Sequence, residues 1–379
     1  MKKKKFEDYE NLDKLINVCL SKVDGSFTGS WQDVSNILGG GFAPEALARF
    51  GKYIAIYRDN QLTKDESIEK VIELQKERRK LCDQRRELNR SITELARMEG
   101  LFDMFDEHLK NRERVVAFDK GVLVTHVNKK REALVYLSDI HYGIKVNNEL
   151  NKYDTETCKE SFRKLYNDTK SMLKLYETNK LTILLGGDLV SGIIHTNLRL
   201  QQEEDVIDQV LAVGDLIEEM ATNFKALGVE VSIVGTIGNH SRVMQDKQQN
   251  LSSENFERII FRQLERAGFN ILQESDVAVF DVANNPVVAL HGHQTSPQKA
   301  FTYCVKRKKV IPSTILMAHY HNDMRVDDGC PVIVNGSMVG TDEHALEFGY
   351  CSQPHQKIMI FEEGKGEICT FKSIFDNRI

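Results

Sequence analysis

The chain has 379 residues, of which 41% are hydrophobic and 28% are charged, and this length allows two domains with at least one large core. Its formal net charge of -5 excludes an overall electrostatic attraction to nucleic acid, so such binding would need a local basic patch. The seven cysteines form no CxxC pair, which argues against a disulfide framework and is typical of reduced thiols in the cytoplasm. The basic start, Lys2 to Lys5, is followed by acidic residues instead of a signal-peptide core, and no apolar run is long enough to span a membrane. We therefore expect an intracellular, cytoplasmic protein with no membrane partner.

Residues 1–130 are expected to form a helical region. Ser30 and Asp33 have the spacing of a capping box, which predicts a short helix directly after Ser30. Three consecutive glycines at 39–41 end this helix, and a second helix is expected to start near Pro44. Two short helices around a glycine turn, over residues 30–57, predict either a DNA-binding helix-turn-helix or a plain helical hairpin.

A long helix is expected from about residue 63 to residue 97. Apolar residues recur in it every seven positions, which is the spacing of a coiled-coil seam. The members of this repeat are Leu74, Leu81, Leu88, Leu95, Phe102 and Leu109. Gly100 is expected to interrupt the helix, so that the last two members fall in a second one. The repeat favours either a homodimer through this region or packing of the helix against its own domain.

The same helix is rich in basic side chains. They are Lys76, Arg78, Arg79, Lys80, Arg85, Arg86 and Arg90. This stripe could follow a phosphate backbone, or it could be a solvated helix face, because acidic residues such as Glu77 and Asp83 lie within one turn. A short β-hairpin, over residues 115–118 and 122–125, is expected to join this region to the rest of the chain.

From residue 131 onward the sequence alternates strand and helix, and metal-competent residues follow the strand-like apolar runs. The runs end shortly before Asp139 and His141, before Asp188, before Asn239 and His240, before His291 and His293, and before His319 and His321. In open α/β architectures the carboxyl ends of strands border the active-site crevice, so the five segments are expected to converge. Any one motif alone would be explained as a buried polar residue or a surface histidine, whereas all five in order predict a metal site.

The short spacings within these motifs fit metal binding. Asp139 and His141 should alternate on an extended segment, so that both side chains point the same way, and His319 and His321 repeat this arrangement. Glycine before Asp188 allows the backbone to turn sharply beside a metal. A carboxylate can bridge two cations, and mixed oxygen and nitrogen ligands suit Mn, Fe, Zn or Ni. An all-oxygen site for Mg or Ca would not need so many imidazoles.

As a set, these motifs resemble the full signature of the calcineurin-like metallophosphoesterases. The residues that carry the resemblance are Asp139-x-His141, Gly187-Asp188, Gly238-Asn239-His240, His291 and His319-x-His321. The resemblance implies an α/β fold, with a four-layer α/β/β/α sandwich over residues 131–379 after the helical region. It also implies two divalent metal ions, with Mn²⁺ as the first choice and Fe, Zn or Ni as alternatives. By the same resemblance, one metal is held by Asp139, His141, Asp188 and His321, and the other by Asp188, Asn239, His291 and His319, with Asp188 as the bridge.

Three further positions follow from this comparison with the family. His291-Gly292-His293-Gln294 is similar to the HGHQ segment of small phosphodiesterase-like members, in which the first histidine is the ligand, so His293 is expected beside the ligands and not on a metal. Asn335-Gly336-Ser337 is similar to a turn of the same members, although the usual proline is absent. The acid that usually follows the Asn-His pair is replaced by Ser241, so the partner that orients His240 must come from elsewhere.

The expected reaction is hydrolysis of a phosphoester. Two adjacent cations can clamp a phosphate and lower the pKa of a bridging water, which makes hydroxide available as the nucleophile near neutral pH. His240, which is not needed as a ligand, is expected to protonate the leaving group as the general acid. Arg242 either stabilises charge on the phosphate or forms a surface salt bridge. His195 either shapes a substrate pocket or is an ordinary loop histidine.

Basic segments favour nucleic acid as the substrate and partner, with DNA preferred to RNA. They are the helical stripe, the helix-turn-helix pattern and the run Lys306-Arg307-Lys308-Lys309. The layout loosely resembles phage-encoded nuclease-like members of the family, which implies a phosphodiesterase of the nuclease type. The alternatives are a phosphatase or phosphodiesterase that acts on a nucleotide or phosphoprotein, and a non-catalytic binding scaffold.

Overall fold

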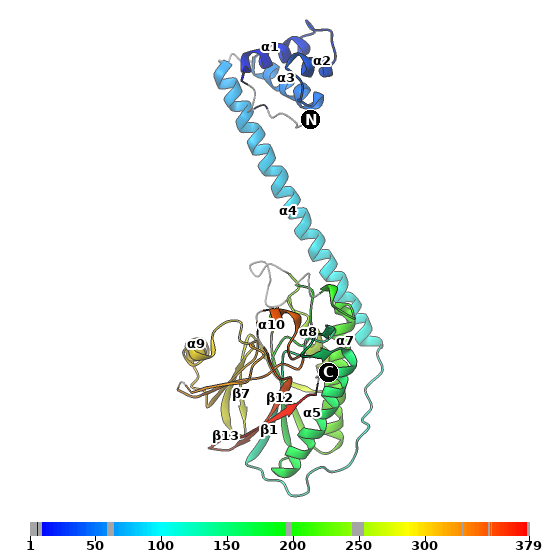
Figure 1. Cartoon of the computed structure of the whole chain (residues 1–379), viewed down its shortest axis with the longest axis vertical. Coiled ribbons are helices and arrows are strands. Elements are labelled where there is room, and N and C mark those ends of the chain that lie inside the picture. The colour runs from blue at the N-terminus through cyan, green and yellow to red at the C-terminus, as the bar shows by residue number, and fades with distance from the viewer. Residues whose placement is uncertain are drawn as a thin grey trace. The chain divides into compact units, whose positions relative to one another are not determined.

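The computed structural model describes the chain except for residues 1–5, 7–9, 59–63, 195–198, 245–253, 328, 348, 350 and 377–379. It contains two compact units, Met1–Gly100 and Leu101–Ile379 (Figure 1). Helices and two larger β-sheets together make the mixed α/β class that the sequence predicts. None of the described helices has both the length and the apolar character needed to cross a membrane.

The N-terminal unit is built around three short helices and the first part of a long one. Their bounds are α1 (Leu12–Val23), α2 (Trp31–Ile37), α3 (Pro44–Arg58) and α4 (Lys64–Asn111). The predicted capping box is confirmed, because the Ser30 amide donates to Asp33 over 2.6 Å and the Asp33 amide donates to Ser30 Oγ over 3.2 Å. Buried apolar side chains from all four helices, such as Leu15, Val34 and Phe50, form the core of this unit.

A glycine turn separates α2 from α3. Gly39, Gly40 and Gly41 have φ angles of 83°, 73° and 92°. Three consecutive left-handed residues are strained for any side chain with a Cβ atom, so only glycine makes this turn without cost. The turn lets Leu38 and Phe42 on either side of it enter the same apolar core.

The expected interruption of the long helix at Gly100 is wrong. Helix α4 continues through this position to Asn111, because one glycine costs a helix interior only about 1 kcal/mol and burial of Phe105 and Leu109 offsets that cost. The three leucines Leu74, Leu81 and Leu88 of the seven-residue repeat are 43%, 61% and 60% exposed. This part of the seam is therefore not buried among the described residues of its own unit.

The predicted β-hairpin over residues 115–125 is also wrong. The segment between α4 and the first strand has no strand pairing in the structure. Instead, the amides of Phe118 and Asp119 donate to the side chain of Asn223 over 2.8 and 3.0 Å. The amide of Leu123 donates to the Leu227 carbonyl over 2.9 Å. These backbone groups are satisfied by the end of a neighbouring helix, so the segment does not need a partner strand.

The C-terminal unit contains two larger sheets. The six-stranded sheet has the order β13-β12-β1-β4-β5-β6, and the five-stranded sheet has the order β10-β11-β9-β8-β7. The strands of the first are β1 (Arg131–Leu137), β4 (Lys180–Leu185), β5 (Glu230–Thr236), β6 (Asn270–Ser275), β12 (His355–Glu362) and β13 (Gly366–Ile374). Those of the second are β7 (Val277–Val282), β8 (Asn285–Leu290), β9 (Thr314–Met317), β10 (Met324–Asp327) and β11 (Pro331–Val334). A small pair, β2 (Val146–Asn147) and β3 (Lys152–Tyr153), lies outside both sheets.

The core of this unit includes a cluster of apolar side chains from both sheets. Leu134 and Tyr136 of β1 belong to the same buried cluster as Phe280 of β7, Ala289 of β8 and Leu316 of β9. The strands β1, β4 and β5 pair in parallel, and so do β8, β9 and β11. Since parallel strands end on the same edge of a sheet, each sheet presents several carboxyl ends together.

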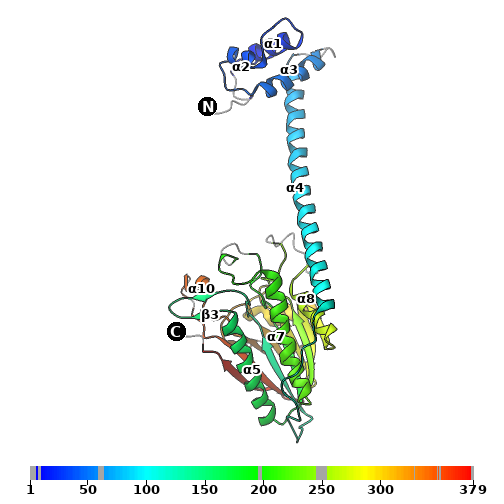
Figure 2. The same cartoon turned by 90° about the vertical axis from the view of Figure 1, so that its right-hand side faces the viewer.

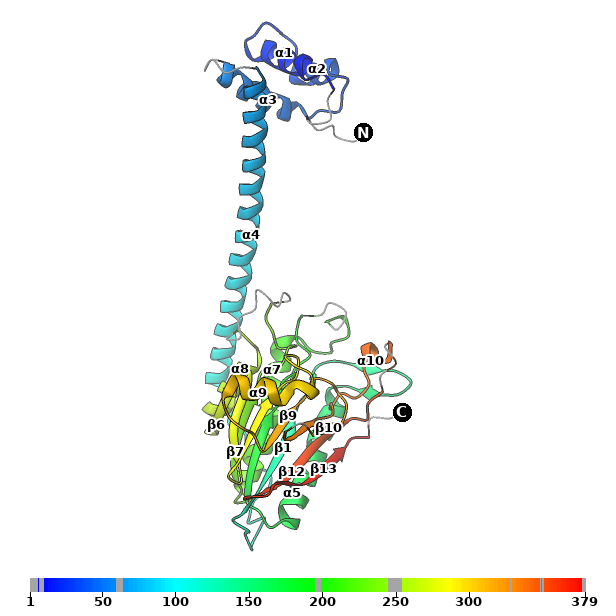
Figure 3. The ribbon, with the colours of Figure 1, turned by 90° about the vertical axis from the view of Figure 1, so that its left-hand side faces the viewer.

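Helices contact both sheets. The helices are α5 (Thr155–Leu175), α7 (Val206–Ala226), α8 (Glu257–Arg266), α9 (Ala300–Lys308) and α10 (Glu343–Glu347), with a 3₁₀ turn η2 (Pro297–Lys299) before α9. Helix α5 contacts β1, β12 and β13, and α7 contacts β5 (Figure 2). Ala300 and Cys304 of α9 pack among the side chains of the second sheet, and Figure 3 labels this helix and the strands β7, β9 and β10 of that sheet. This packing fixes the strands whose carboxyl ends carry the polar motifs.

Candidate metal centre

Polar residues follow directly after the carboxyl ends of parallel strands in both sheets. Asp139 follows β1, Asp188 follows β4 and Asn239 follows β5 in the first sheet, whereas His291 follows β8 and His319 follows β9 in the second. Because the two sheets share one apolar core, these loops meet. The convergence of the five segments predicted from sequence is therefore present in the structure.

The backbone at these positions differs from the extended segments expected from the spacing. Asp139, His141, Asp188, His319 and His321 have φ angles of 48°, 48°, 52°, 73° and 57°. Each is a left-handed conformation that is uncommon for residues with side chains and costs on the order of 1–3 kcal/mol. These five are among nine described non-glycine residues with positive φ, and their close contacts place their side chains in the space between the loops. Alternation along a strand therefore does not explain how they meet.

Glycine is required where two of these loops touch. A Cβ atom at Gly238 would lie 2.2 Å from the amide nitrogen of Asp188 and 2.2 Å from its Oδ1. A Cβ atom at Gly187 would lie 2.7 Å from the backbone of Gly238. No side chain fits within these distances, so the two glycines allow the loops after β4 and β5 to approach each other.

The described residues contain three groups of side chains whose ligand atoms could hold a metal ion. They are Asp139 with His141 and His321, His141 with Asp188 and His240, and Asp188 with His291 and His319. Asp188 belongs to two of these groups, so its carboxylate lies between them. Seven residues predicted from the sequence are thus brought together in one centre.

Close contacts within the centre join atoms that normally accept hydrogen bonds or bind metals. The Nε2 atoms of His141 and His321 are 3.2 Å apart. His321 Nε2 lies 3.4 Å from Asp139 Oδ1, and His291 Nε2 lies 3.0 Å from Asp188 Oδ2. The aspartates and His291 are buried, so bulk water does not screen the interactions among these groups.

The donor set fits divalent cations. The Nδ1 atom of His291 lies 2.8 Å from the carbonyl oxygen of Gly186, and since a carbonyl only accepts, Nδ1 carries the hydrogen. When His291 is neutral, its Nε2 atom therefore bears the lone pair that can bind a cation. Among the described residues, His291 Nε2, Asp139 Oδ1 and Asn239 Oδ1 are buried polar atoms with no hydrogen-bond partner. Cations bound by carboxylate, amide and imidazole ligands would satisfy all three atoms.

Burial and mutual charge shift the pKa values of these groups strongly. Burial raises the pKa of Asp188, but the imidazoles of His291 and His240 hold it well below its ordinary value. Burial lowers the pKa of His291, and the carboxylate of Asp188 more than compensates, raising it to about 10. Burial, together with His291, lowers the pKa of His319 to about 4. Without a cation, the centre therefore holds a proton on His291 near neutral pH.

This proton predicts a pH dependence of metal binding. His291 must be neutral to bind a cation, and the pKa of about 10 means that it is protonated at pH 7 in the metal-free protein. Mn²⁺ affinity is therefore expected to rise by at least about tenfold per pH unit between about pH 6 and pH 8, as the cation displaces one proton. Mn²⁺ titration by calorimetry in buffers of different ionisation enthalpy measures both the affinity and the protons released. An affinity that is independent of pH would contradict this assignment of His291.

The partner that orients His240 comes from the loop after β4. His240 Nδ1 lies 3.2 Å from the carbonyl oxygen of Ser191, so this nitrogen donates to the carbonyl and the ring orientation is fixed. The amide of His240 donates to Asp188 Oδ1 over 2.7 Å, and its ring packs 4.5 Å from the ring of His141. The missing acid at Ser241 is thus replaced by a backbone carbonyl that the sequence could not reveal.

The other predicted positions have different outcomes. Arg242 Nε donates to the carbonyl oxygen of Asn239 over 2.9 Å, so this side chain belongs to the loop of the centre. The exposed ring of His293 lies 5.6 Å from the ring of His291 and 6.2 Å from that of His319, and it belongs to none of the three groups. His195 lies outside the described residues.

A buried amide network supports the loop after β1. Asn335 Nδ2 donates to the carbonyl oxygen of Tyr136 and to Ser138 Oγ over 3.0 and 2.9 Å. Gln356 Nε2 donates to the Ser138 carbonyl over 3.1 Å, and the Ser138 amide donates back to Gln356 Oε1 over 2.9 Å. The turn at Asn335 noted in the sequence therefore fixes the residue immediately before Asp139.

Glu257 is a positioning residue that no sequence motif indicates. Its side chain is fully buried at the start of α8. Glu257 Oε1 accepts the amide of Leu189 over 3.0 Å, and Oε2 accepts the amide of Gly238 over 2.7 Å. One carboxylate thus joins the loop that carries Asp188 to the loop that carries Asn239. Sequence reasoning missed Glu257 because nothing around it links it to the centre.

Replacement of Glu257 with Gln is expected to weaken metal binding by about 10–100-fold, the usual effect of losing a group that orients the ligands. Glutamine retains one acceptor, but its amide group would face the second backbone N–H and could not accept from it. Mn²⁺ titration of the variant measures the effect. Glu274→Gln is a matched control, because Glu274 is a half-buried acid that pairs with Arg258 outside the centre. Equal Mn²⁺ affinities in the two variants would show that Glu257 has only a structural role.

Comparison with known proteins gives one relative in sequence and several in structure. No family model matches the chain. The SPbeta prophage-derived uncharacterized protein YonJ of Bacillus subtilis (strain 168) is 21% identical over 396 aligned residues, which cover 95% of each chain. This relative carries no activity in its name.

Solved structures of similar fold include an archaeal phosphodiesterase, with 13% identity over 63% of this chain and 99% of the other, at a TM-score of 0.34. A predicted phosphoesterase from Streptococcus pneumoniae TIGR4 has 9% identity over 64% and 98%, at a TM-score of 0.27. Wild-type Vps29 from Entamoeba histolytica, complexed with Zn²⁺, has 13% identity over 64% and 99%, at a TM-score of 0.28.

Proposed function

We propose that this chain is a metal-dependent phosphoesterase that uses two divalent cations to hydrolyse phosphodiester bonds of nucleic acid. The observation that carries the proposal is the buried carboxylate of Asp188, which is shared by two groups of metal-competent side chains. Unsatisfied acceptor atoms of Asp139, Asn239 and His291 in the same space support it. Such a shared carboxylate is the arrangement that a two-metal hydrolase needs.

The proposed ligands are divided between the two cations. Asp139, His141, Asp188 and His321 hold the first, and Asp188, Asn239, His291 and His319 hold the second. Among the alternatives Mn²⁺, Fe, Zn and Ni, we take Mn²⁺ as the first choice for this mixture of oxygen and nitrogen ligands. The four-layer α/β/β/α sandwich over residues 131–379, after a helical region over residues 1–130, is part of the same proposal. The shared core of the two sheets and the helices on each of them support it.

Bound cations of this kind polarise a phosphate and lower the pKa of a water held between them. The chain itself supplies the proton for the leaving group. His240 is oriented by the Ser191 carbonyl and is half-buried beside the ligands, so its Nε2 can donate to the departing oxygen. Arg242 is bonded to the Asn239 carbonyl, where its charge would favour a bound phosphate.

A polyanionic substrate is supported by a basic run near the carboxyl end of β8. Leu290, the last residue of β8, pairs with Val277. Asp276, the residue before Val277, accepts a hydrogen bond from Arg307 over 3.1 Å. The basic run therefore lies near the end of β8. Lys306 and Lys309 on either side of Arg307 are exposed. Together with the basic stripe of α4, this run supports nucleic acid as the substrate, and we keep DNA as the first choice over RNA.

An ester panel tests the proposal. Purified full-length protein with Mn²⁺ is offered single- and double-stranded DNA, RNA, bis-p-nitrophenyl phosphate and p-nitrophenyl phosphate. We expect cleavage of the nucleic acid and of bis-p-nitrophenyl phosphate, and loss of both activities after chelation of the metal. Hydrolysis of the monoester alone would instead indicate a phosphatase. If the purified protein contains no metal and hydrolyses none of the esters after Mn²⁺ is added, the chain is a binding scaffold.

A further inference from the structure

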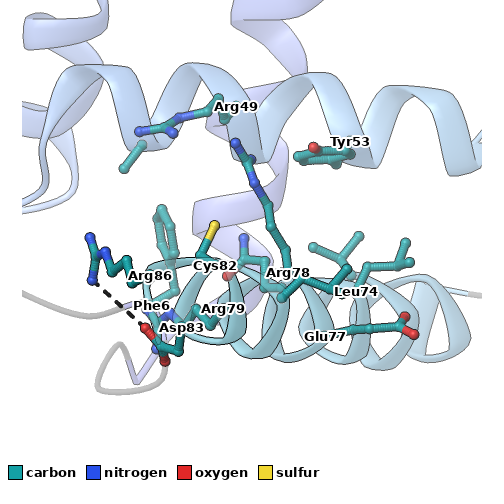
Figure 4. A pocket seen from close by; sticks show the side chains of 14 residues that line it. Phe6, Arg49, Tyr53, Leu74, Glu77, Arg78, Arg79, Cys82, Asp83 and Arg86 are labelled. Atoms are coloured by element: carbon teal, nitrogen blue, oxygen red, sulfur yellow. Dashed lines mark ion pairs between the residues drawn. The ribbon is translucent and has the colours of Figure 1, made fainter. Parts of the chain in front are cut away.

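A groove in the N-terminal unit lies between α3 and α4. Its volume is about 650 Å³, and both helices and Phe6 line it. Arg49 and Tyr53 come from α3, whereas Leu74, Arg78 and Cys82 come from α4 (Figure 4). The groove belongs to one compact unit and is separate from the metal-competent residues of the other.

The groove carries a net positive charge, because four arginines line it beside two acids, Glu77 and Asp83. Figure 4 shows the Arg78 side chain extending from α4 toward α3, where Arg49 lies. Arg49 Nε donates to the carbonyl oxygen of Glu45 over 3.1 Å, which leaves its two terminal nitrogens for another acceptor. Among the side chains that the structure describes, no carboxylate lies within ion-pair distance of Arg49, Arg78 or Arg79. The pair between Arg86 and Asp83 is 3.7 Å long and exposed, so it neutralises little of the charge.

Apolar and aromatic surfaces accompany the guanidinium groups. Tyr53 is 36% exposed, and Leu74 and Leu81 are 43% and 61% exposed, although all three line the groove. Guanidinium groups bind phosphate oxygens through paired N–H donors. Exposed aromatic rings stack with unpaired bases and contribute about 1–3 kcal/mol per base. The groove thus offers both kinds of contact that a nucleotide chain needs.

The position of α4 selects single-stranded over double-stranded nucleic acid. In a helix-turn-helix the second helix enters a major groove that is about 12 Å wide, and it needs a free outer face. Here α3 is the second helix of the pattern, and its residues Arg49 and Tyr53 face the groove shared with α4 (Figure 4). Because α4 lines the same groove as this face of α3, we take a single strand and not a duplex as its occupant.

We propose that the groove between α3 and α4 binds single-stranded nucleic acid, with Arg49 and Arg78 on phosphates and Tyr53 stacked on a base. This proposal rests on the proposed phosphodiester substrate and assigns a separate site that holds it. Of the basic residues along α4, only those that line the groove would then contact the nucleic acid.

Fluorescence anisotropy of a labelled oligothymidylate, with full-length protein, tests this site. The double variant Arg49→Ala/Arg78→Ala is expected to weaken binding at least about tenfold. The slope of log affinity against log salt should also become shallower by about 1.4, because each lost arginine–phosphate pair contributes roughly 0.7. Arg85→Ala is the matched control, since Arg85 is an exposed arginine of the same helix that does not line the groove, and its affinity should stay within about twofold. The Tyr53→Leu variant should weaken binding by about 5–150-fold.

Other outcomes separate this site from the proposed catalytic activity. Equal effects of the double variant and Arg85→Ala would overturn the groove as the binding site. Tighter binding of a duplex than of the single strand would overturn the selection by α4. Unchanged binding of the double variant, with altered dimerisation in light scattering, would identify the groove as an interface between copies. Hydrolysis of bis-p-nitrophenyl phosphate should be unaffected in every variant, so failure of this inference would leave the proposed catalytic function intact.

Discussion

Replacement of Asp188 with Asn is expected to lower the hydrolysis of bis-p-nitrophenyl phosphate by about a thousandfold and to reduce bound metal from two ions to one or none per chain. Each cation is expected to contribute several kcal/mol of transition-state stabilisation, and about 4 kcal/mol corresponds to a thousandfold in rate. Asn removes the negative charge that two of the three metal-competent groups share. Activity assays and metal analysis of the purified variant measure the two effects.

Asparagine is the informative substitution at this position for two reasons. Asp188 has a φ of 52°, and asparagine tolerates this left-handed conformation better than alanine does. Its side-chain oxygen can also keep the hydrogen bond from the His240 amide. Asp276→Asn is the control, because Asp276 pairs with Arg307 and belongs to none of the metal-competent groups. A variant Asp188→Asn that retained both ions and full activity would exclude Asp188 as the bridge.

Replacement of His240 with Ala is expected to leave two bound ions per chain and to reduce turnover by about 10²–10⁴-fold for a substrate with a poor leaving group. A general acid matters most when the departing oxygen is strongly basic. The loss should therefore be smaller for p-nitrophenyl esters, whose leaving group departs without a proton. Comparison of kcat for a nitrophenyl diester and a dinucleotide, together with metal analysis, measures both parts of this prediction.

The structure also allows a different role for His240, because its ring lies in a group with His141 and Asp188. Loss of metal in parallel with activity would show that His240 is a ligand and not the proton donor. An equal loss of turnover for good and poor leaving groups would also contradict the assignment. His126→Ala is a suitable control, since His126 is an exposed histidine outside the centre.

The strand-end motifs were predictable because their information is local. Each apolar run and the polar residue after it are contiguous in the sequence, and the rule that parallel strands end on one edge places them together. The conformation at those positions was not predictable from the spacing. Asp139 and His141 meet the same centre through left-handed backbone, which loops distant in sequence hold in place.

Residues that act across distant loops left no local signal. Glu257 joins two loops through backbone amides, and any buried acid at the start of a helix has the same appearance in sequence. The Ser191 carbonyl that orients His240 is a backbone atom, so no side-chain pattern identifies it. These contacts depend on the packing of α8 and of the loop after β4, which only the structure shows.

Errors in the connecting regions arose from competition between local preference and burial. Gly100 was expected to break a helix, but Phe105 and Leu109 beyond it are buried and continue α4. The apolar residues around Phe118 have strand-like character, yet the amide of Phe118 is satisfied by Asn223 of α7. In both places a tertiary contact outweighs a weak local propensity.

Anomalous diffraction from crystals grown with Mn²⁺ tests the two-metal centre most directly. Two peaks separated by about 3.5–4 Å are expected, with the Asp188 carboxylate between them and His291 and His321 on opposite sides. A single peak, or peaks that do not include Asp188 among their ligands, would contradict the proposed two-metal phosphoesterase.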